Sequence, residues 1–397
     1  MAPPRVNPFL FAQFIATIDR LSAERAGAPK IVDRLLRDNP RQFWPSLTGH
    51  PDIRTAGALG HLALLVTEHL NRDAQYSLSL AELAAGAAAG LPDHAYPAVL
   101  RAQLRAHALK NLGKVQRQLA RYDDAIAAFS QAEGLLQEHH VLHYEIAVVR
   151  LHLAYTYQEV DRFSEALALM RECKEVFLES GDTHMVFITG MTEATLLQRL
   201  AKYREAREAY LLLLVTGTPA AESVAALRKA LGLCCIELQD FATAEANLVE
   251  SARIYTALGQ PLEALRAEAA HGRLLIRIGE IERAITRLEP VRRGFLRQGM
   301  HEEAGICALE IVEGFLSQNK PEDAEHLARR VIEEFTRAKL NKRAIIALGY
   351  LSRAIAAKRA SVPLVHNVRD YILSLRTNPK REFPGRTATA SARGSEQ

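Results

Sequence analysis

The chain places apolar residues three and four positions apart along most of its length, with polar residues between them. The segment 122–129 is typical, because Tyr122, Ala125, Ile126 and Phe129 share one face of a helix while Asp123 and Asp124 do not. No β-rich stretch with the two-residue alternation of a strand interrupts this pattern. The sequence therefore predicts an all-α protein.

The helical pattern repeats with a period near 40 residues. An alanine recurs at spacings of 41, 40, 38, 40 and 40, at Ala125, Ala166, Ala206, Ala244, Ala284 and Ala324. Twelve positions earlier the residue is usually small: Gly113, Ala154, Ala194, Gly232, Gly272, and then Val312. Three positions earlier it is usually large: Tyr122, Phe163, Tyr203, Phe241, Ile281, and then Pro321. Four positions later it is usually bulky: Phe129, Met170, Tyr210, Leu248, Leu288, and then Ala328.

This arrangement predicts a series of helix hairpins. Small residues on the two helices of a hairpin let their backbones approach, and the large residues pack around that contact. Helix-breaking residues fall between the units, at Gly181, at Gly217 with Pro219, at Gly259 with Pro261, at Gly299, and at Asn319 with Pro321.

The pattern resembles the tetratricopeptide repeat (TPR) family over residues 106–338, about six units. In the first clear unit the family's small, aromatic, alanine and bulky positions are Gly113, Tyr122, Ala125 and Phe129. The period differs from the family's usual 34 residues, and its Trp at position four and Pro at position thirty-two are missing. The resemblance implies a right-handed α-α superhelix, or solenoid, of TPR-like hairpins in a long-period variant.

The flanking regions divide the chain further. Residues 1–50 form an N-terminal segment with two helices expected within 9–44, separated at Gly27-Ala28-Pro29. Residues 51–105 hold a degenerate helix pair (52–70 and 77–90), residues 106–340 the six repeats, and residues 341–376 a closing pair (343–358 and 362–376). Ser361 and Pro363 suit the start of the last helix. Residues 377–397 are expected to be a disordered basic tail.

Composition changes this picture little. The 397 residues are 48% hydrophobic and 24% charged, which suits a packed core rather than general disorder. No apolar run reaches the ~20 residues that a membrane-spanning helix needs. Four cysteines form no CxxC pair, and polar residues interrupt the apolar stretch near the N-terminus, so we expect a cytoplasmic protein with reduced thiols.

The sequence predicts no enzyme, cofactor or metal site. It lacks phosphate-binding, dinucleotide-binding, serine-hydrolase and zinc-protease motifs, and no catalytic residue stands out. His139 and His143 have the i,i+4 spacing of metal ligands, with His140 beside them, but a polar connection between helices explains them better. Cys234 and Cys235 are adjacent, and buried packing explains them better than redox chemistry.

The resemblance implies a binding surface on the first helix of each hairpin. Thirty such positions carry eight Lys or Arg and three Glu, a net charge of +5. Lys110, Lys114 and Arg117 lie at i, i+4 and i+7, on one helix face. The candidate groove residues are His107, Lys110, Lys114, Arg117, Tyr155, Gln158, Arg199, Lys229, Arg273 and Arg277.

These features predict a non-catalytic scaffold that binds a partner protein or peptide, with an acidic segment in a basic concave groove. The alternative is a ligand- or peptide-responsive sensor, because long-period TPR arrays also occur in bacterial transcription regulators. We expect no membrane partner. Nucleic acid is disfavoured, because a net charge of +4 is small and residues 1–45 show no convincing helix-turn-helix. That charge lies at the two ends, residues 1–45 (+3) and 376–397 (+3), while the remaining span is −2. A solvated basic face without a ligand is the competing interpretation.

Overall fold

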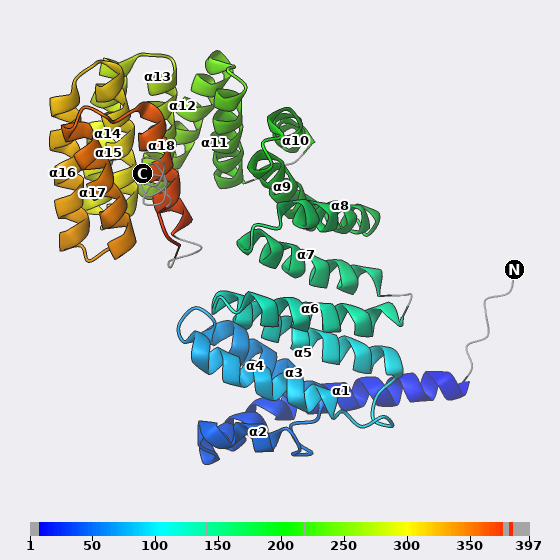
Figure 1. The fold of residues 1–397 in the computed structure, drawn as a ribbon. Coiled ribbons are helices and arrows are strands. Elements are labelled where there is room, and N and C mark those ends of the chain that lie inside the picture. The colour runs from blue at the N-terminus through cyan, green and yellow to red at the C-terminus, as the bar shows by residue number, and fades with distance from the viewer. Residues whose placement is uncertain (1–7, 140–141, 217–219, 376–380, 384–397) are drawn as a thin grey trace, which may run out of the picture. The chain divides into compact units, whose positions relative to one another are not determined.

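The computed structural model describes residues 8–139, 142–216, 220–375 and 381–383. These residues form eighteen α-helices and one short 3₁₀ helix, with no strand among them (Figure 1). The first elements are α1 (Pro8–Asp38), η1 (Arg41–Phe43), α2 (Trp44–Leu47), α3 (Ala56–His69) and α4 (Ala74–Ala89). The array continues with α5 (Ala98–Gln118), α6 (Tyr122–Gln137), α7 (His143–Glu159), α8 (Phe163–Glu179), α9 (Thr183–Arg199), α10 (Tyr203–Thr216), α11 (Ala221–Glu237), α12 (Phe241–Ala257), α13 (Pro261–Arg277), α14 (Ile281–Arg297), α15 (His301–Ser317), α16 (Pro321–Arg337), α17 (Lys342–Ala356) and α18 (Val362–Ser374).

The chain divides into two compact units, Met1–Leu196 (unit 1) and Leu197–Gln397 (unit 2). Within each unit, helices that follow one another in the sequence pack side by side, such as α5 on α6 and α13 on α14. This is the all-α hairpin architecture that the sequence predicts. None of the helices in the described ranges is long and apolar enough to cross a membrane.

The 40-residue period comes from two equal halves. Helices α13 to α16 each have 17 residues and begin at positions 261, 281, 301 and 321, so three residues connect each to the next. Each of these connections contains a residue with positive φ, and the N–H of the next residue donates back into the preceding helix, as in Glu280 N to Leu275 O at 2.9 Å. This is the Schellman pattern that ends a helix by satisfying its last carbonyls. The residues with positive φ are Ala120, Asp161, Gly181, Ala201, Gln239, Gly259, Gly279, Gly299, Asn319, Lys339 and Lys358.

The small and large repeat positions pack as the sequence predicts. The six aligned alanines of the second helices are all fully buried. A Cβ added to Gly113 would lie 2.8 Å from the Phe129 ring, and one added to Gly272 would lie 2.3 Å from Leu288. The bulky residue of the second helix therefore rests directly on the glycine of the first helix, and any side chain there would push the two helices apart.

The sixth unit reverses this size pattern. Val312 replaces the small residue and Ala328 replaces the bulky one, and both are fully buried. The two departures therefore compensate each other at equivalent positions, since a larger residue on one helix accompanies a smaller one on the other. The total side-chain volume at this helix contact is therefore kept, although the small and the larger residue have changed helices.

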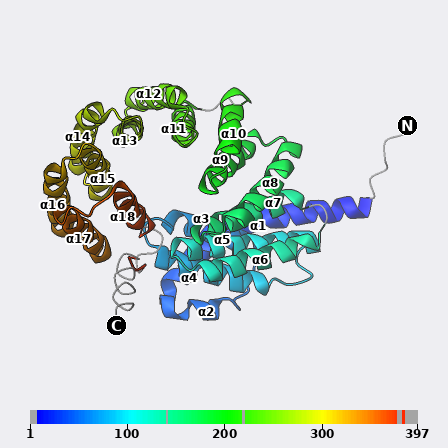
Figure 2. The same ribbon diagram turned by 45° about the horizontal axis from the view of Figure 1, so that its top comes forward.

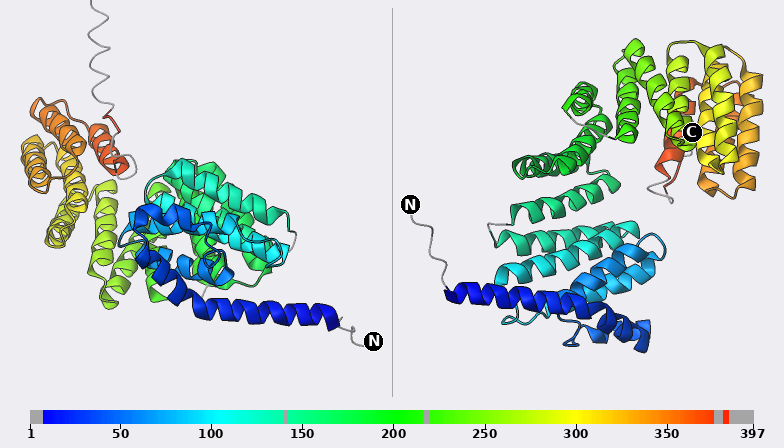
Figure 3. Two further views of the ribbon diagram at one scale, coloured as in Figure 1. Left: turned by 90° about the horizontal axis from the view of Figure 1, so that it is seen from below. Right: turned by 180° about the vertical axis from the view of Figure 1, so that it is seen from behind.

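The N-terminal segment differs from its prediction. The expected break at Gly27-Ala28-Pro29 is absent, and α1 runs through Pro29 as one helix of 31 residues whose N-terminal part extends beyond its neighbours in unit 1 (Figure 3). Proline in a helix interior loses one hydrogen bond and costs about 3 kcal/mol. Packing outweighs this cost, because Ala28 and Val32 are buried and α1 crosses α3 at Gly57, where an added Cβ would lie 2.4 Å from the Glu24 carbonyl.

The closing helix pair is present as α17 and α18. Ser361 occupies the N-cap position with Pro363 in the first turn, although the serine side chain makes no capping hydrogen bond. Helix α18 contacts α15 as well as α17, and it lies on the side of α15 away from α14 and α16 (Figure 2). Most of the expected tail at 377–397 lies outside the described residues. Within it, Phe383 is buried and its ring packs edge-on against Tyr371.

Candidate binding surface

The first helices of the hairpins carry the candidate residues, and in unit 1 these are α5 and α7. Lys110, Lys114 and Arg117 follow one face of α5, and the neighbouring α7 contributes Tyr155 and Gln158. The Arg117 guanidinium lies 5.5 Å from the centre of the Tyr155 ring, a cation–π contact. The structure therefore brings these predicted residues of unit 1 onto two adjacent helices.

Lys110, Lys114 and Arg117 have no ion-pair partner among the described residues, although all three are partly buried. Burial, and then the charge of Lys114, lowers the pKa of Lys110 below its usual range. Burial and the charge of Arg117 likewise lower the pKa of Lys114. For Arg117, burial lowers the pKa while Glu159 acts in the opposite direction. This face of α5 therefore carries concentrated positive charge, and no acidic side chain forms an ion pair with it among the described residues.

Two histidines complete this group, which we call the cationic cluster (His107, Lys110, Lys114, Arg117 and His152). Surrounding protein atoms and the charges of Lys110 and Lys114 lower the pKa of His107 to about 4, although the residue keeps an exposed edge. Burial, followed by the charges of Lys114, Lys110 and Arg117, lowers the pKa of His152 to about 3. Both rings are neutral at pH 7 and available for hydrogen bonds.

Sequence reasoning did not place His152 on this surface, although it lies one helical turn before Tyr155. Its ring stacks on Phe129 with the ring centres 5.9 Å apart and the planes at 17°. Its Nδ1 atom is buried and has no hydrogen-bond partner among the described residues. The three-residue spacing to Tyr155 was the signal that could have identified it.

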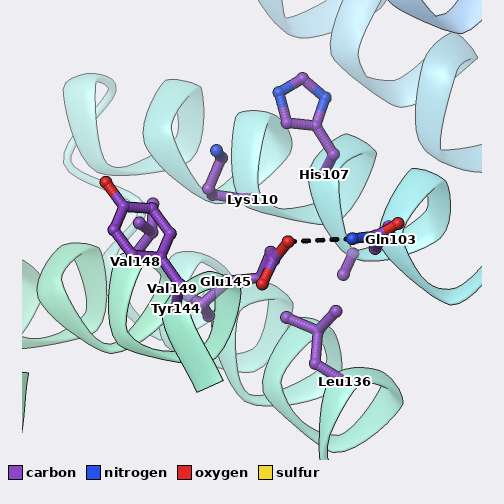
Figure 4. A pocket seen from close by; sticks show the side chains of 9 residues that line it. Gln103, His107, Lys110, Leu136, Tyr144, Glu145, Val148 and Val149 are labelled. Atoms are coloured by element: carbon purple, nitrogen blue, oxygen red, sulfur yellow. Dashed lines mark hydrogen bonds between the residues drawn. The ribbon is translucent and has the colours of Figure 1, made fainter. Parts of the chain in front are cut away.

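A pocket of about 230 Å³ opens beside the cluster, between α5, α7 and the end of α6 (Figure 4). Its wall is mainly apolar, and its polar rim includes Gln103, whose Nε2 donates to Glu145 Oε1 at 2.9 Å. Of its lining residues, His107 and Lys110 are among the candidate groove residues, and Val148 is one of the thirty first-helix positions counted with them; the others were not proposed from the sequence. The lining residues are Gln103, Ala106, His107, Lys110, Leu136, Tyr144, Glu145, Val148 and Val149.

The candidate cations of unit 2 are placed differently, because most of them pair with acids of a neighbouring hairpin. Lys229 Nζ lies 2.7 Å from Glu263 Oε2, and its ammonium also lies 5.5 Å from the Tyr255 ring centre. The remaining pairs are Arg273 Nε with Glu310 Oε1 at 2.8 Å and Arg277 Nη2 with Glu237 Oε1 at 3.6 Å. We call these three pairs the ion-pair ladder. Arg199 is exposed near the end of α9.

Helix α18 adds two more basic residues to this face of unit 2. His366 Nε2 lies 2.8 Å from Glu313 Oε2, and Arg369 Nη1 lies 3.3 Å from Glu310 Oε1. Burial alone would raise the pKa of Glu310, but Arg273 and Arg369 hold it below the usual range. The chain's own residues therefore pair with Glu310 and Glu313 and cover part of the surface of α15.

The other candidate chemistry does not assemble into a site. No group of three His, Cys, Asp or Glu side chains in the described ranges could hold a metal ion. His139 follows the end of α6 and His143 begins α7, so the two do not share one helix, and His140 lies outside the described residues. Cys234 and Cys235 are buried, and burial raises the pKa of Cys234 to about 11, which disfavours the reactive thiolate.

Comparisons with known proteins identify the fold. No protein-family model and no curated protein matches the sequence. A signal-transduction ATPase (STAND protein) with a tetratricopeptide repeat sensor, from Pyrococcus horikoshii, is 14% identical with a TM-score of 0.56, covering 90% of this chain and 53% of that one. The apo quorum sensor NprR from B. thuringiensis is 13% identical with a TM-score of 0.53, and the match covers 81% of this chain and 99% of that one. A tetratricopeptide repeat protein from Parabacteroides merdae is 16% identical with a TM-score of 0.50, and the match covers 74% of this chain and 98% of that one.

Proposed function

From the TPR-like solenoid fold of the chain, we propose that the protein is a non-catalytic interaction scaffold in the cytoplasm, which binds an acidic partner segment on the surface formed by α5 and α7. The observation that carries this proposal is the cationic cluster, whose α5 cations are partly buried and have no ion-pair partner among the described residues.

Unpaired charge in a partly desolvated site favours an anionic ligand. Desolvation has already weakened the hydration of these ammonium groups, so an incoming carboxylate gains more Coulomb energy than it would at an exposed site. The neutral rings of His107 and His152 and the Tyr155 hydroxyl can add hydrogen bonds. In contrast, an acidic ligand at the ion-pair ladder would have to displace Glu263, Glu310 or Glu237. We therefore assign ligand binding to unit 1 rather than to the whole series of hairpins.

Charge reversal tests the proposal with a matched control. The test variant combines Lys110→Glu, Lys114→Glu and Arg117→Glu, and the control combines Lys30→Glu, Arg34→Glu and Arg37→Glu. The control residues have the same i, i+4, i+7 spacing, are exposed on α1 in the same unit, and give the same change in net charge.

Fluorescence anisotropy with labelled Asp/Glu-rich peptides in a Gly/Ser background gives the readout. We expect the test variant to lose affinity roughly tenfold or more, and the control to stay within about threefold of the unchanged protein. Higher salt should weaken binding to the unchanged protein, because screening reduces the attraction. Equal losses in both variants would mean that only the overall charge matters, and no loss in the test variant would refute the proposal.

A peptide-responsive sensor is the second candidate function. Two of the similar structures are described as sensors, the STAND protein and NprR. In a sensor, peptide bound at α5 and α7 would change the dynamics of unit 2, whereas in a simple scaffold it would protect only the contacted helices. Hydrogen exchange with saturating peptide distinguishes the two functions, and a gel shift at moderate salt tests for any nucleic-acid binding.

A further inference from the structure

The pocket beside the cationic cluster suits an apolar side chain. Ala106, Leu136, Val148 and Val149 provide most of its wall, and its volume is about 230 Å³. A cavity of about 150 Å³ lined by apolar side chains binds benzene in another protein, so this volume accommodates a leucine or phenylalanine side chain. An acidic segment alone would leave this wall as exposed to water as it is in the free protein, so the wall would add nothing to the binding free energy.

The charges around the pocket are not symmetric along α5. At the N-terminal side, the Glu145 carboxylate accepts a hydrogen bond from Gln103, and it would repel an acidic group there. Toward the C-terminal side, Lys110 stands at the rim, and Lys114 follows one turn later on the same face (Figure 4 shows the rim). An acidic group of a bound ligand therefore belongs on one side of the apolar pocket only.

The helix also sets the spacing between these features. With a rise of 1.5 Å per residue, Lys110 lies about 6 Å and Lys114 about 12 Å along the axis from Ala106, which stands at the middle of the pocket's α5 wall. An extended peptide advances about 3.3 Å per residue, so these distances correspond to about two and four residues, and side chains at both positions point to the same face as the apolar one. Glu159 partly compensates Arg117, which makes Lys110 and Lys114 the more strongly anion-attracting positions.

We propose that the ligand is an extended peptide that places one large apolar side chain in the pocket and acidic side chains two and four residues away, over Lys110 and Lys114. This inference rests on the proposed function, because it specifies the acidic segment that the same surface binds. It adds an apolar requirement and a spacing that charge attraction alone would not impose.

A set of synthetic peptides tests both additions. The parent is a nine-residue Gly/Ser peptide with one leucine and with Asp and Glu at the second and fourth following positions. One relative replaces the leucine with serine, one replaces the acids with their amides, and one moves the acids three residues farther from the leucine. Because an extended chain can bind in either direction, a further relative adds a second acidic pair on the other side of the leucine.

For the unchanged protein, we expect loss of the leucine to weaken binding roughly tenfold, since burying such a side chain stabilises a complex by about 1.5 kcal/mol or more. Moving the acids should weaken binding to nearly the level of the amide peptide. The second acidic pair should give no gain, because it lies next to Glu145.

Variants of Val148 show whether the pocket itself causes the preference for the leucine peptide over the serine peptide. Val148 is only partly buried, so Val148→Trp should fill the pocket without disturbing the helix, and Val148→Ala is the matched control that leaves it open. We expect Val148→Trp to bind the leucine and serine peptides equally while keeping its preference for acids. Circular dichroism melting curves establish that both variants are folded.

The outcomes separate this inference from the proposed function. Equal binding of the leucine and serine peptides to the unchanged protein would overturn the apolar requirement, while acid-dependent binding would still support the proposed function. Equal binding of the moved and unmoved acids would overturn the spacing. If no acidic peptide bound and charge reversal had no effect, both proposals would be refuted.

Discussion

Lys110 and Lys114 of the cationic cluster hold the same repeat positions as Lys229 and Arg273 of the ion-pair ladder, but the two pairs differ in charge balance. In unit 1, the next first helix places His152 near Lys114, and its Glu145 accepts a hydrogen bond from Gln103 rather than pairing with Lys110. In unit 2, Lys229 and Arg273 each pair with a glutamate from the next first helix. The same basic residue is therefore a structural element where an acid of the next repeat pairs with it, and a candidate binding element where none does.

The largest effect should come from removing a cation of the ladder. Arg273→Met leaves Glu310 almost fully buried, with Arg369 as its remaining partner. We expect a loss of about 2–3 kcal/mol in the free energy of unfolding, below the usual 3–5 for a broken buried pair because Arg369 stays and Arg273 is one-third exposed.

The matched change in unit 1 is Lys110→Met, which should alter stability by less than about 0.5 kcal/mol or raise it, because the lysine loses no partner. Urea unfolding followed by circular dichroism measures both variants. Equal destabilisation by the two substitutions would remove the proposed difference between the units.

The helix packing, in contrast, should be the same in both units. Gly113→Ala and Gly272→Ala introduce a Cβ at 2.8 Å from Phe129 and 2.3 Å from Leu288, respectively, so each should destabilise the protein by about 1–2 kcal/mol. Gly60→Ala is the control, since it has no heavy atom within 4 Å and lies in a helix, where alanine is stabilising by up to about 1 kcal/mol. Thermal unfolding curves give the three shifts. A stabilising effect of Gly113→Ala or Gly272→Ala would show that the hairpins are less tightly packed than described.

Acid should affect the two surfaces over different pH ranges. The folded-state pKa of His152 is about 3, below its value of 6.5 in an unfolded chain. The contribution of the neutral ring to the free energy of unfolding is therefore fully present above pH 6.5 and is lost as the pH falls toward 3. The pKa of Glu310 is also lowered, but its contribution is lost only as the pH falls below about 4.5. Between pH 7 and 5, hydrogen exchange should therefore accelerate in α5–α7 without a contribution from Glu310.

His152→Phe provides the control for this pH range, because phenylalanine keeps the ring stacked on Phe129 but takes up no proton. It should reduce the slope of stability against pH by up to about 1.4 kcal/mol per pH unit, the limit for one proton. His271 in unit 2 also has a pKa lowered by burial, so its helix, α13, is compared separately. If His152→Phe left the slope of stability against pH unchanged, this pH dependence would not come from His152.

The smallest effect should come from the turns. Ala120 ends α5 with φ of 56°, and Gly279 holds the corresponding place in unit 2 with φ of 82°. Ala120→Gly should stabilise the protein by about 0.5–1 kcal/mol because glycine adopts this conformation without steric cost, and Gly279→Ala should destabilise it similarly. Ala127→Gly, in the interior of α6, should be destabilising and serves as the control. Melting temperatures of the three variants test the signs.

The repeat itself was predictable because helix patterning is local. The aligned alanines, with Gly113 facing Phe129, reveal the hairpins and their phase, and the structure confirms both. The turns within a hairpin were less visible, because Ala120, Ala201 and Gln239 adopt positive φ without being glycine. There the closing hydrogen bonds and the packing of both helices determine the backbone.

The local residue pattern is enough to predict the all-α repeat, the phase of its hairpins and the row of basic residues on first helices. The packing of the helices, in contrast, determines that α1 continues through Pro29, that Glu310 pairs with Arg273 and Arg369, and that Lys110, Lys114 and Arg117 have no ion-pair partner within the described chain. The difference arises from distance along the chain. Helix formation depends on residues three and four positions apart, whereas ion pairs such as Lys229 with Glu263 join residues more than thirty positions apart and depend on how adjacent hairpins stack.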